Sequence, residues 1–234
     1  MRVAACIIQA RLGSSRLPAK TMLRLPSGSC VLEEVIRRCW HIKGIGVVAV
    51  AAPDTQENDI IADVARRART VCVRGPEHDV LARYYKAADE LGADIVMRIT
   101  SDCPLLDVDT CGAVLKLRET TGADYVSNSW PSRHFPHGWD CEVFTREALE
   151  LADASVPRVA YGAGEVTWGI DSADATQALY DREHVTPWLQ RSPDIKRAFL
   201  KDMQDRSHIR WTLDTLADYK VIWDEFVRRE KEAA

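Results

Sequence analysis

Continuous apolar stretches alternate along the chain with stretches in which apolar positions recur every three or four residues. Unbroken apolar runs are typical of strands covered on both faces, and the wider spacing is typical of amphipathic helices. The pattern predicts strands at residues 3–10, 47–52, 70–73, 93–100, 123–128 and 208–214. It predicts helices at residues 31–42, 57–68, 78–92, 108–120, 145–154, 180–191 and 215–233. Thr145 and Thr215 are the expected N-caps, and Pro187 divides the helical region at 180–191 or begins a helix there.

The order of these elements defines the expected fold. Strands that alternate with helices through short connections are typical of a mostly parallel sheet with helices on both faces, a three-layer α/β/α arrangement. The pattern changes after Asn128, where aromatic, proline and histidine residues gather. We therefore interpret residues 1–234 as one domain and residues 129–180 as a small antiparallel or irregular arm within it. Within that arm, the stretch at residues 155–178 is expected to be a loop.

Composition and charge restrict the class of protein. Hydrophobic residues make up 46% of the 234 positions and charged residues 28%, as in a globular protein that buries a substantial core. The net charge of -4 argues against broad nucleic-acid binding, and no apolar run approaches the roughly 18 residues of a membrane span. The N-terminal apolar stretch is too short for a signal peptide, so we expect a buried first strand and a cytoplasmic protein.

The cysteines are interpreted as structural. There are seven, and none forms a CxxC pair that would indicate a zinc ribbon. Most lie in apolar segments, as reduced core thiols do. Cys103 differs because it follows Asp102, but no histidine near it in the sequence could activate it as a nucleophile. His134 and His137 lack metal-site spacing to any acid or cysteine, which argues against zinc.

The loop after the first strand concentrates candidate chemistry. It lies within IIQARLGSSRLPAKTML, residues 7–23, and combines three cations with small residues: Arg11, Gly13, Ser14, Ser15, Arg16 and Lys20. In an open parallel sheet, ligands bind at the carboxyl ends of the strands. Charge beside a buried strand is costly unless an anion accompanies it. The loop therefore predicts a phosphate site, and the alternative is a plain surface loop with solvated arginines.

Two common phosphate motifs do not fit this loop. A Walker loop requires G-x-x-x-x-G-K-[ST]. Here Ala19 precedes Lys20 where that motif has its second glycine, and it lies one residue too far from Gly13. Pro18 also removes one N–H from a loop that would work through N–H groups. The dinucleotide fingerprint G-x-G-x-x-G fails as well, because no second glycine follows Gly13.

The same segment resembles the N-terminal signature of the cytidylyltransferases that activate acidic sugars, including the acylneuraminate and 3-deoxy-manno-octulosonate enzymes. Five further blocks resemble the branch of spore coat polysaccharide biosynthesis protein F, in the same order: VRGPEHDVLARYYKAADELGADIVMRITSDCPLLD, DYVSNS, FPHGWDCEVF, REHVTPW and RWTLDTLADY. The resemblance covers most of the chain. It implies a fold like that of the nucleotide-diphospho-sugar transferases and a homodimer, with residues 129–180 as the segment expected to form the acceptor site and the dimer contact.

The resemblance also implies a reaction, the Mg²⁺-dependent transfer of CMP from CTP to an acceptor with release of pyrophosphate. Such chemistry depends on positioning and charge neutralisation. Carried over to this sequence, the catalytic residues are Arg11, Lys20 and Asp102, the nucleotide-binding residues are Gly13, Ser14, Ser15, Arg16, Arg74 and Asp79, and the metal ligands are Asp102 and Asp214. Asp79 is equally interpretable as a first-turn helix charge. Arg98 could contact phosphate or pair with Asp102. Asp218 could support the metal ligands from behind or face solvent, and we expect the latter.

The acceptor, a small acidic sugar or related molecule, is expected to meet the segment from Ser127 to Phe144. Arg133 could bind an acceptor carboxylate, and Asn128, Asp140 and Glu142 could bind hydroxyls; for each, an ordinary surface role is the alternative. His184 lies in REHVTPW, a block that resembles the family, although a lone histidine is more often structural than catalytic. Ala19 and Ser101 stand where the branch usually has glycine.

Two other functions stay open on sequence grounds. One is a glycosyltransferase that uses a ready-made nucleotide sugar on the same fold. The other is a non-catalytic nucleotide-binding protein. The joint presence of Lys20, Asp102 and Asp214 argues against a non-catalytic protein. The cation cluster suits a whole triphosphate, which favours a cytidylyltransferase for polysaccharide biosynthesis over a glycosyltransferase.

Overall fold

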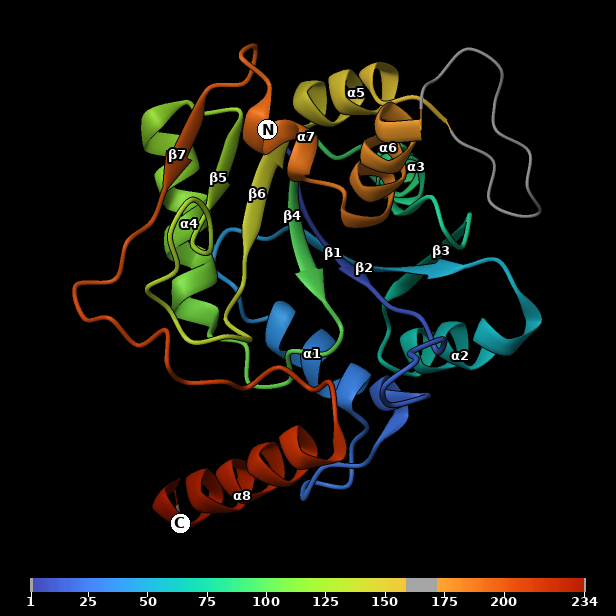
Figure 1. The fold of residues 1–234 in the computed structure, drawn as a ribbon. Helices are drawn as coiled ribbons and strands as arrows, with labels where there is room; N and C mark the ends of the chain where they lie inside the picture. The colour runs from blue at the N-terminus through green and yellow to red at the C-terminus, as the bar shows by residue number, and fades with distance from the viewer. Residues whose placement is uncertain (1, 159–171, 234) are drawn as a thin grey trace.

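A central sheet of seven strands carries helices on both faces (Figure 1). The computed structural model describes residues 2–158 and 172–233. The strands are β1 (Ala4–Gln9), β2 (Val47–Pro53), β3 (Val71–Gly75), β4 (Ile95–Thr100), β5 (Tyr125–Ser127), β6 (Glu142–Thr145) and β7 (Arg197–Phe199). Their order in the sheet is β3-β2-β1-β4-β6-β5-β7. The sheet therefore places β1 and β4 side by side at its centre.

Strands β1 to β4 form a parallel half because their residues are apolar on both faces. β1 pairs in parallel with β2 on one side and with β4 on the other. Successive side chains of β1 alternate between the two faces: Cys6 and Ile8 join one core cluster, whereas Ala5 and Ile7 join the other. This parallel half fixes the carboxyl ends of β1 and β4 at one edge, where we expect ligands to bind.

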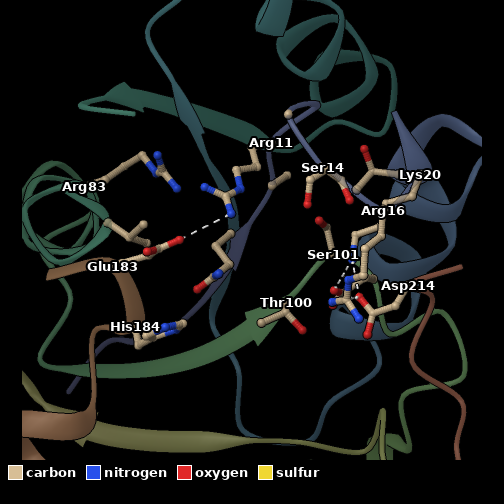
Figure 2. Close-up of a pocket in the computed structure, with 17 residues that line it drawn as sticks. Arg11, Ser14, Arg16, Lys20, Arg83, Thr100, Ser101, Glu183, His184 and Asp214 are labelled. Atoms are coloured by element: carbon tan, nitrogen blue, oxygen red, sulfur yellow. Dashed lines mark hydrogen bonds and ion pairs between the residues drawn. The ribbon is translucent and has the colours of Figure 1, made fainter. Parts of the chain in front are cut away.

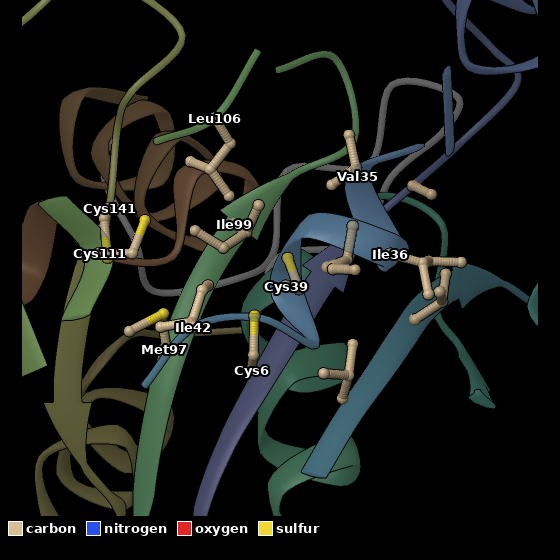
Figure 3. Packing of buried hydrophobic residues seen from close by; sticks show 14 of the residues in the cluster. Cys6, Val35, Ile36, Cys39, Ile42, Met97, Ile99, Leu106, Cys111 and Cys141 are labelled. Carbon is tan, nitrogen blue, oxygen red and sulfur yellow. The ribbon is translucent and has the colours of Figure 1, made fainter. Parts of the chain in front are cut away.

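The helices form the two outer layers and a separate C-terminal support. They are α1 (Val31–Cys39), α2 (Asp59–Arg67), α3 (Val80–Glu90), α4 (Val108–Thr121), α5 (Arg146–Ser155), α6 (Ser172–His184), α7 (Pro187–Arg191) and α8 (Leu216–Ala233), with single 3₁₀ turns at Lys20–Met22 and Gln56–Asn58. Helices α1, α2 and α4 cover one face, whose core is shown in Figure 3. Helices α3, α5, α6 and α7 cover the other face. The predicted three-layer fold is confirmed.

Helix α8 lies against the loop that follows β1. Ile222 and Phe226 of α8 pack with Leu17 and Leu25, which flank the 3₁₀ turn at Lys20–Met22, and with Leu213. The predicted cap of α8 is confirmed, because Thr215 Oγ1 accepts a hydrogen bond of 3.2 Å from the Asp218 N–H. Thr145 caps α5 in the same way through the Ala148 N–H, at 3.1 Å.

The predicted antiparallel or irregular arm contributes a strand to the sheet. Residues 129–141 are irregular, and β6 then runs antiparallel between β4 and β5, both as expected. The expected loop at residues 155–178 is helical from Ser172 onward, where α6 begins. Residues 159–171 lie outside the described part of the chain, so the predictions made for them are not addressed by the structure.

The predicted strand at residues 208–214 is wrong. In this segment only Arg210 forms a bridge, with His137, made by the His137 N–H to the Ile209 carbonyl and the Trp211 N–H to the His137 carbonyl. In the described part of the chain no strand lies alongside to continue the ladder, so the apolar alternation reflects packing of single side chains. The last strand is β7, whose three residues pair with β5. Within the described residues, no helix is both long and apolar enough to cross a membrane.

Candidate active site

A cavity of about 310 Å³ opens at the carboxyl ends of β1 and β4 (Figure 2). Eight of the predicted site residues line it: Arg11, Gly13, Ser14, Ser15, Arg16, Lys20, Asp102 and Asp214. The loop after β1 supplies the first six, the turn after β4 supplies Asp102, and the segment before α8 supplies Asp214. Sequence segments more than a hundred residues apart thus meet in one pocket.

The loop after β1 is held from both ends. The Leu12 N–H donates to Asn58 Oδ1 at 2.9 Å, and Asn58 is fully buried. The Ala19 N–H closes the loop by donating to the Leu12 carbonyl at 3.0 Å. Ala19 adopts φ 53° and ψ 27°, a left-handed conformation that favours glycine. Glycine would adopt this backbone conformation more readily than alanine, which agrees with the expectation that a glycine is the more usual residue here.

Lys20 links the two predicted metal ligands. Its Nζ lies 2.6 Å from Asp102 Oδ2 and 2.9 Å from Asp214 Oδ1. Burial lowers the pKa of Lys20, but the charges and hydrogen bonds of the two aspartates outweigh burial and raise its pKa above the ordinary value. For Asp214, burial acts in the opposite direction and raises the pKa. The positive charges of Lys20, Arg16 and Arg210 outweigh burial, so the pKa of Asp214 lies below its ordinary value. The two carboxylates therefore hold a cation between them.

Asp214 is positioned by its own neighbourhood. Arg16 and Arg210 lie 2.9 Å and 2.5 Å from its carboxylate oxygens. Asp218 Oδ2 accepts hydrogen bonds from the N–H groups of Asp214 at 3.1 Å and Thr215 at 2.8 Å. The expectation that Asp218 faces solvent is therefore wrong, and the alternative, that it supports the predicted metal ligands, agrees with the geometry: it orients the backbone that carries Asp214. Asp214 itself follows an extended segment rather than the predicted strand.

The opposite wall of the pocket comes from α3 and α6. Arg11 Nη2 lies 3.4 Å from Glu183 Oε1, and Figure 2 shows Arg11 between Arg83 and the Lys20 end of the cavity. His184 also lines the pocket, and burial lowers its pKa, so its imidazole is neutral near pH 7. Sequence reasoning did not identify Arg83 or Glu183. Both residues lie in blocks that resemble the family, VRGPEHDVLARYYKAADELGADIVMRITSDCPLLD and REHVTPW, but they belong to helical segments whose facing cannot be fixed without the fold.

Arg74 and Asp79 do not line this pocket. The Arg74 guanidinium donates to the carbonyls of Pro53 and Thr55, each at 2.7 Å, and pairs with Asp59 at 2.9 Å. Asp79 caps α3 by accepting from the Ala82 N–H at 2.9 Å. The alternative interpretation of Asp79, as a charge at the start of a helix, agrees with this geometry.

The predicted acceptor residues are engaged with other protein groups. Asn128 is buried and bridges the Trp139 carbonyl and the Cys141 N–H, at 2.7 and 2.9 Å. Arg133 pairs with Asp140. Glu142 pairs with Arg98 at 2.6 Å. The structure thus gives Arg98 a partner other than Asp102, and it places none of the four residues on the cavity wall.

The cysteines are consistent with structural roles. All seven are unpaired, six are buried, and Cys72 is half-buried. Burial raises the pKa of Cys103 well above its ordinary value, which suppresses the thiolate a nucleophile needs. Among the residues described, no group of three or more histidine, cysteine or acidic side chains is arranged to hold a metal.

The sheet, the cation-rich loop and the paired aspartates together define an enzyme of the nucleotidyltransferase class. The chain matches the Cytidylyltransferase family over residues 5–231 and belongs to that family. An uncharacterised protein of Methanocaldococcus jannaschii is 31% identical, with 92% of this chain and 79% of the relative covered. The spore coat polysaccharide biosynthesis protein SpsF of Bacillus subtilis is 26% identical, with 92% and 83% covered. The predicted family is confirmed.

Solved structures support the same assignment. A cytidylyltransferase of Leptospira borgpetersenii has a TM-score of 0.82 and 27% identity, and the match covers 95% of this chain and 86% of that chain. A CMP:2-keto-3-deoxy-manno-octonic acid synthetase complexed with CTP has a TM-score of 0.65, with 97% and 99% covered. At 15% identity this second likeness shows the fold alone.

Proposed function

We propose that this protein transfers CMP from CTP to a hydroxyl group of an acidic sugar or related acceptor, with Mg²⁺ and with release of pyrophosphate, for cell-surface polysaccharide biosynthesis. The observation that carries the proposal is the Lys20 ammonium, 2.6 and 2.9 Å from the carboxylates of Asp102 and Asp214, beside a loop with two arginines. The CTP complex of the synthetase that shares the fold, and the name of the Bacillus subtilis relative, support the nucleotide and the pathway.

The residues of the site fit Mg²⁺. Asp102 and Asp214 offer hard carboxylate oxygens, and Mg²⁺ in proteins is usually held by one or two carboxylates together with water and substrate phosphates. The Lys20 Nζ shows that a cation is stable between these two groups. When bound, the metal ion would neutralise charge on the triphosphate and on the departing pyrophosphate. Because a metal would repel the ammonium, Lys20 would then be free to contact phosphate.

The reaction needs little covalent participation from the protein. The acceptor oxygen attacks the α-phosphorus, a P–O bond to that oxygen forms, and the bond between the α-phosphorus and the bridging oxygen of pyrophosphate breaks. Arg11, Arg16 and Lys20 would bind the phosphate oxygens, and the loop at Gly13–Ser15 would contribute N–H and hydroxyl donors. The neutral imidazole of His184 lies in the same pocket and can accept a hydrogen bond from the acceptor hydroxyl.

The acceptor side is less preorganised than the phosphate side. Arg133 could receive an acceptor carboxylate only by exchanging Asp140 for it, since the two side chains are paired and partly exposed. Asn128 and Glu142 would act indirectly, by fixing the backbone and the strand that border the cavity. The homodimer, formed through residues 129–180, stays a prediction.

One assay tests the proposed function. Pyrophosphate release is measured with each of the four nucleoside triphosphates and Mg²⁺, against a panel of acidic sugars and phosphonates. We expect pyrophosphate release with CTP and one acceptor class. In Asp102→Ala and Asp214→Ala the rate of release should fall by more than the roughly 10- to 100-fold that the loss of a residue behind the metal ligands costs. Asp63→Ala is the matched control, because Asp63 is an exposed acid on α2.

The assay has two unfavourable outcomes. Full activity in both aspartate variants would remove the metal assignment. Metal-independent turnover of a nucleotide sugar, without pyrophosphate release, would replace the proposed reaction with glycosyl transfer.

A further inference from the structure

Lys20 bonds to one carboxylate oxygen of each proposed metal ligand. Its Nζ lies 2.6 Å from Asp102 Oδ2 and 2.9 Å from Asp214 Oδ1. The other two oxygens have different neighbours: Asp214 Oδ2 accepts from Arg210 at 2.5 Å, and Asp102 Oδ1 accepts from the Cys103 thiol at 3.6 Å. The two oxygens that are placed to share one cation are therefore the pair that the ammonium holds.

Mg²⁺ and this ammonium cannot share the same two oxygens. Because Mg²⁺ bonds oxygen at about 2.0–2.1 Å, an ion on both oxygens would lie within roughly 5 Å of Nζ. The side chains are largely shielded from water, since Lys20 is 13% exposed, Asp102 21% and Asp214 11%. Like charges repel strongly at such a separation where water is mostly excluded. One cation must leave before the other can bind.

The charges of the surrounding side chains balance one another. Arg16 lies 2.9 Å from Asp214 Oδ1, and Arg210 contacts both Asp214 and Asp218. With Lys20, these arginines equal in number the acids of the cluster, Asp102, Asp214 and Asp218, so no net negative charge remains to attract a dication. A triphosphate changes this balance, because it brings several negative charges and binds cationic side chains strongly.

Only the side chain of Lys20 has to move for the two cations to exchange. Its backbone begins the 3₁₀ turn at Lys20–Met22, where the Leu23 N–H donates to the Lys20 carbonyl at 3.3 Å and Thr21 is buried. The flexible four-carbon stem of a lysine lets the ammonium swing while this backbone stays in place. The proposed phosphate loop at Gly13–Ser15 lines the same cavity, so phosphate oxygens there would lie within the reach of the ammonium.

We infer that Lys20 holds the place of the metal until the nucleotide arrives, so that the site takes Mg²⁺ and CTP only together, as the complex of the two; this inference rests on the proposed function. The ammonium and the balanced charge exclude the metal alone. The phosphates of the complex attract the ammonium, which frees the two carboxylates for the ion that arrives with them. Metal and nucleotide binding are then linked, and each raises the affinity for the other by the same factor.

The test measures binding of Mn²⁺ alone to the full chain, from the electron paramagnetic resonance signal of the free ion. Mn²⁺ takes the same oxygen ligands as Mg²⁺. Lys20→Met keeps the length of the side chain and removes its charge. Lys116→Met is the matched control, because Lys116 of α4 is 71% exposed and lies outside the cavity. Arg16→Met is a control within the site, because Arg16 bonds to Asp214 but does not bridge to Asp102.

We expect Lys20→Met to bind one Mn²⁺ at least about tenfold more tightly than the unmodified protein, because the ammonium that repels the ion is gone. Adding Asp102→Ala to Lys20→Met should abolish this gain, which locates the ion. Lys116→Met should match the unmodified protein, and Arg16→Met should gain less than Lys20→Met.

Thermal unfolding provides a second measurement. Without the ammonium, two carboxylates face each other with no cation between them, which destabilises the folded state of Lys20→Met. A bound ion restores that stability. We therefore expect Mn²⁺ to raise the Tm of Lys20→Met by more than it raises the Tm of the unmodified protein, even if the variant is poorly folded without metal.

Other outcomes have distinct meanings. Unchanged or weaker Mn²⁺ binding by Lys20→Met, together with an equal Mn²⁺ effect on the two Tm values, would overturn the inference and leave the proposed reaction intact. A gain that also occurs in Lys116→Met, or that survives Asp102→Ala, would overturn it as well, because the ion would then respond to net charge or bind elsewhere. Failure of the unmodified protein to bind CTP in the presence of Mg²⁺ would instead remove the proposed function itself.

Discussion

The main-chain N–H of Leu213 donates a hydrogen bond of 2.8 Å to the main-chain carbonyl oxygen of Asp102. The residue before Asp214 is thereby joined to the other proposed metal ligand. Asp218 supports the same segment from α8 by accepting from the Asp214 N–H. The separation of the two carboxylates is set by backbone contacts, so the site does not depend on a ligand to assemble it. Such preorganisation is the main way that proteins stabilise developing charge.

Gly138 should be intolerant of a side chain. Its φ is +96°, and an added Cβ would lie 2.7 Å from the Trp211 carbonyl oxygen, in the segment that leads to Asp214. We expect Gly138→Ala to lower the free energy of unfolding by more than about 1 kcal/mol, as measured by urea denaturation. Gly28→Ala is the matched control, since Gly28 has φ +83° but no atom within 4 Å of the added Cβ. Equal losses in the two variants would contradict the clash.

Arg74 should matter for stability more than for nucleotide binding. Its guanidinium bonds only to the segment at residues 53–59 and away from the cavity. We expect Arg74→Met to lower the free energy of unfolding by about 1–3 kcal/mol, because three acceptors lose a charged donor. The dissociation constant of CTP should change less than about threefold, a small fraction of one hydrogen bond to a charged group. A large change in CTP affinity with unchanged stability would restore the sequence-based assignment.

Glu225 should make α8 sensitive to acid. Hydrogen bonds from Arg228 and Arg229 lower its pKa to about 2, against an ordinary value of 4.5. A folded-state pKa below the unfolded one adds stability that is complete above pH 4.5 and disappears as the pH falls toward 2.

The comparison of Glu225→Gln with the unmodified protein tests this at several pH values. We expect the variant to be less stable by about 1–2 kcal/mol at neutral pH, given the exposure of Arg228, and equal near pH 2. Glu230→Gln, at an exposed acid of the same helix, should show no such pH-dependent difference. A difference that persists unchanged in acid would rule out the carboxylate as its source.

Thiol labelling should distinguish Cys72 from the other six cysteines. Cys72 is the half-buried one, whereas Cys103 is 1% exposed and its pKa is raised well above the ordinary value by burial. We expect a disulfide reagent to modify at most Cys72 in the native protein and all seven thiols in guanidinium chloride, as counted by mass spectrometry. Rapid native labelling of Cys103 would reopen a nucleophilic role for it.

Much of the fold follows from local pattern, because strands buried on both faces are marked by long apolar runs. β7 and the segment at residues 208–214 show the limit of this reasoning. A three-residue strand owes its pairing to β5 rather than to its own sequence, and apolar alternation also arises where single side chains pack without a ladder. Periodicity alone cannot separate these cases.

In the candidate site, too, some residues could be predicted from the sequence and others could not. The loop residues from Arg11 to Lys20 are close in sequence, so their clustering was predictable. Arg74 shows that closeness in sequence to a pocket does not fix the direction of a side chain. Arg83 lies in a block that resembles the family, but its position on the cavity wall follows only from the assembled fold.

The hydrogen bond between Leu213 and Asp102 also has a consequence for the order of synthesis. Ribosomes release the N-terminal part of a chain first, and that part begins to fold before the remainder exists. Here the loop with Lys20 and the turn with Asp102 would emerge early, but the second aspartate emerges only near residue 214. A chain interrupted between residues 200 and 213 would contain all seven strands of the sheet but would lack Asp214, the second proposed metal ligand, together with α8.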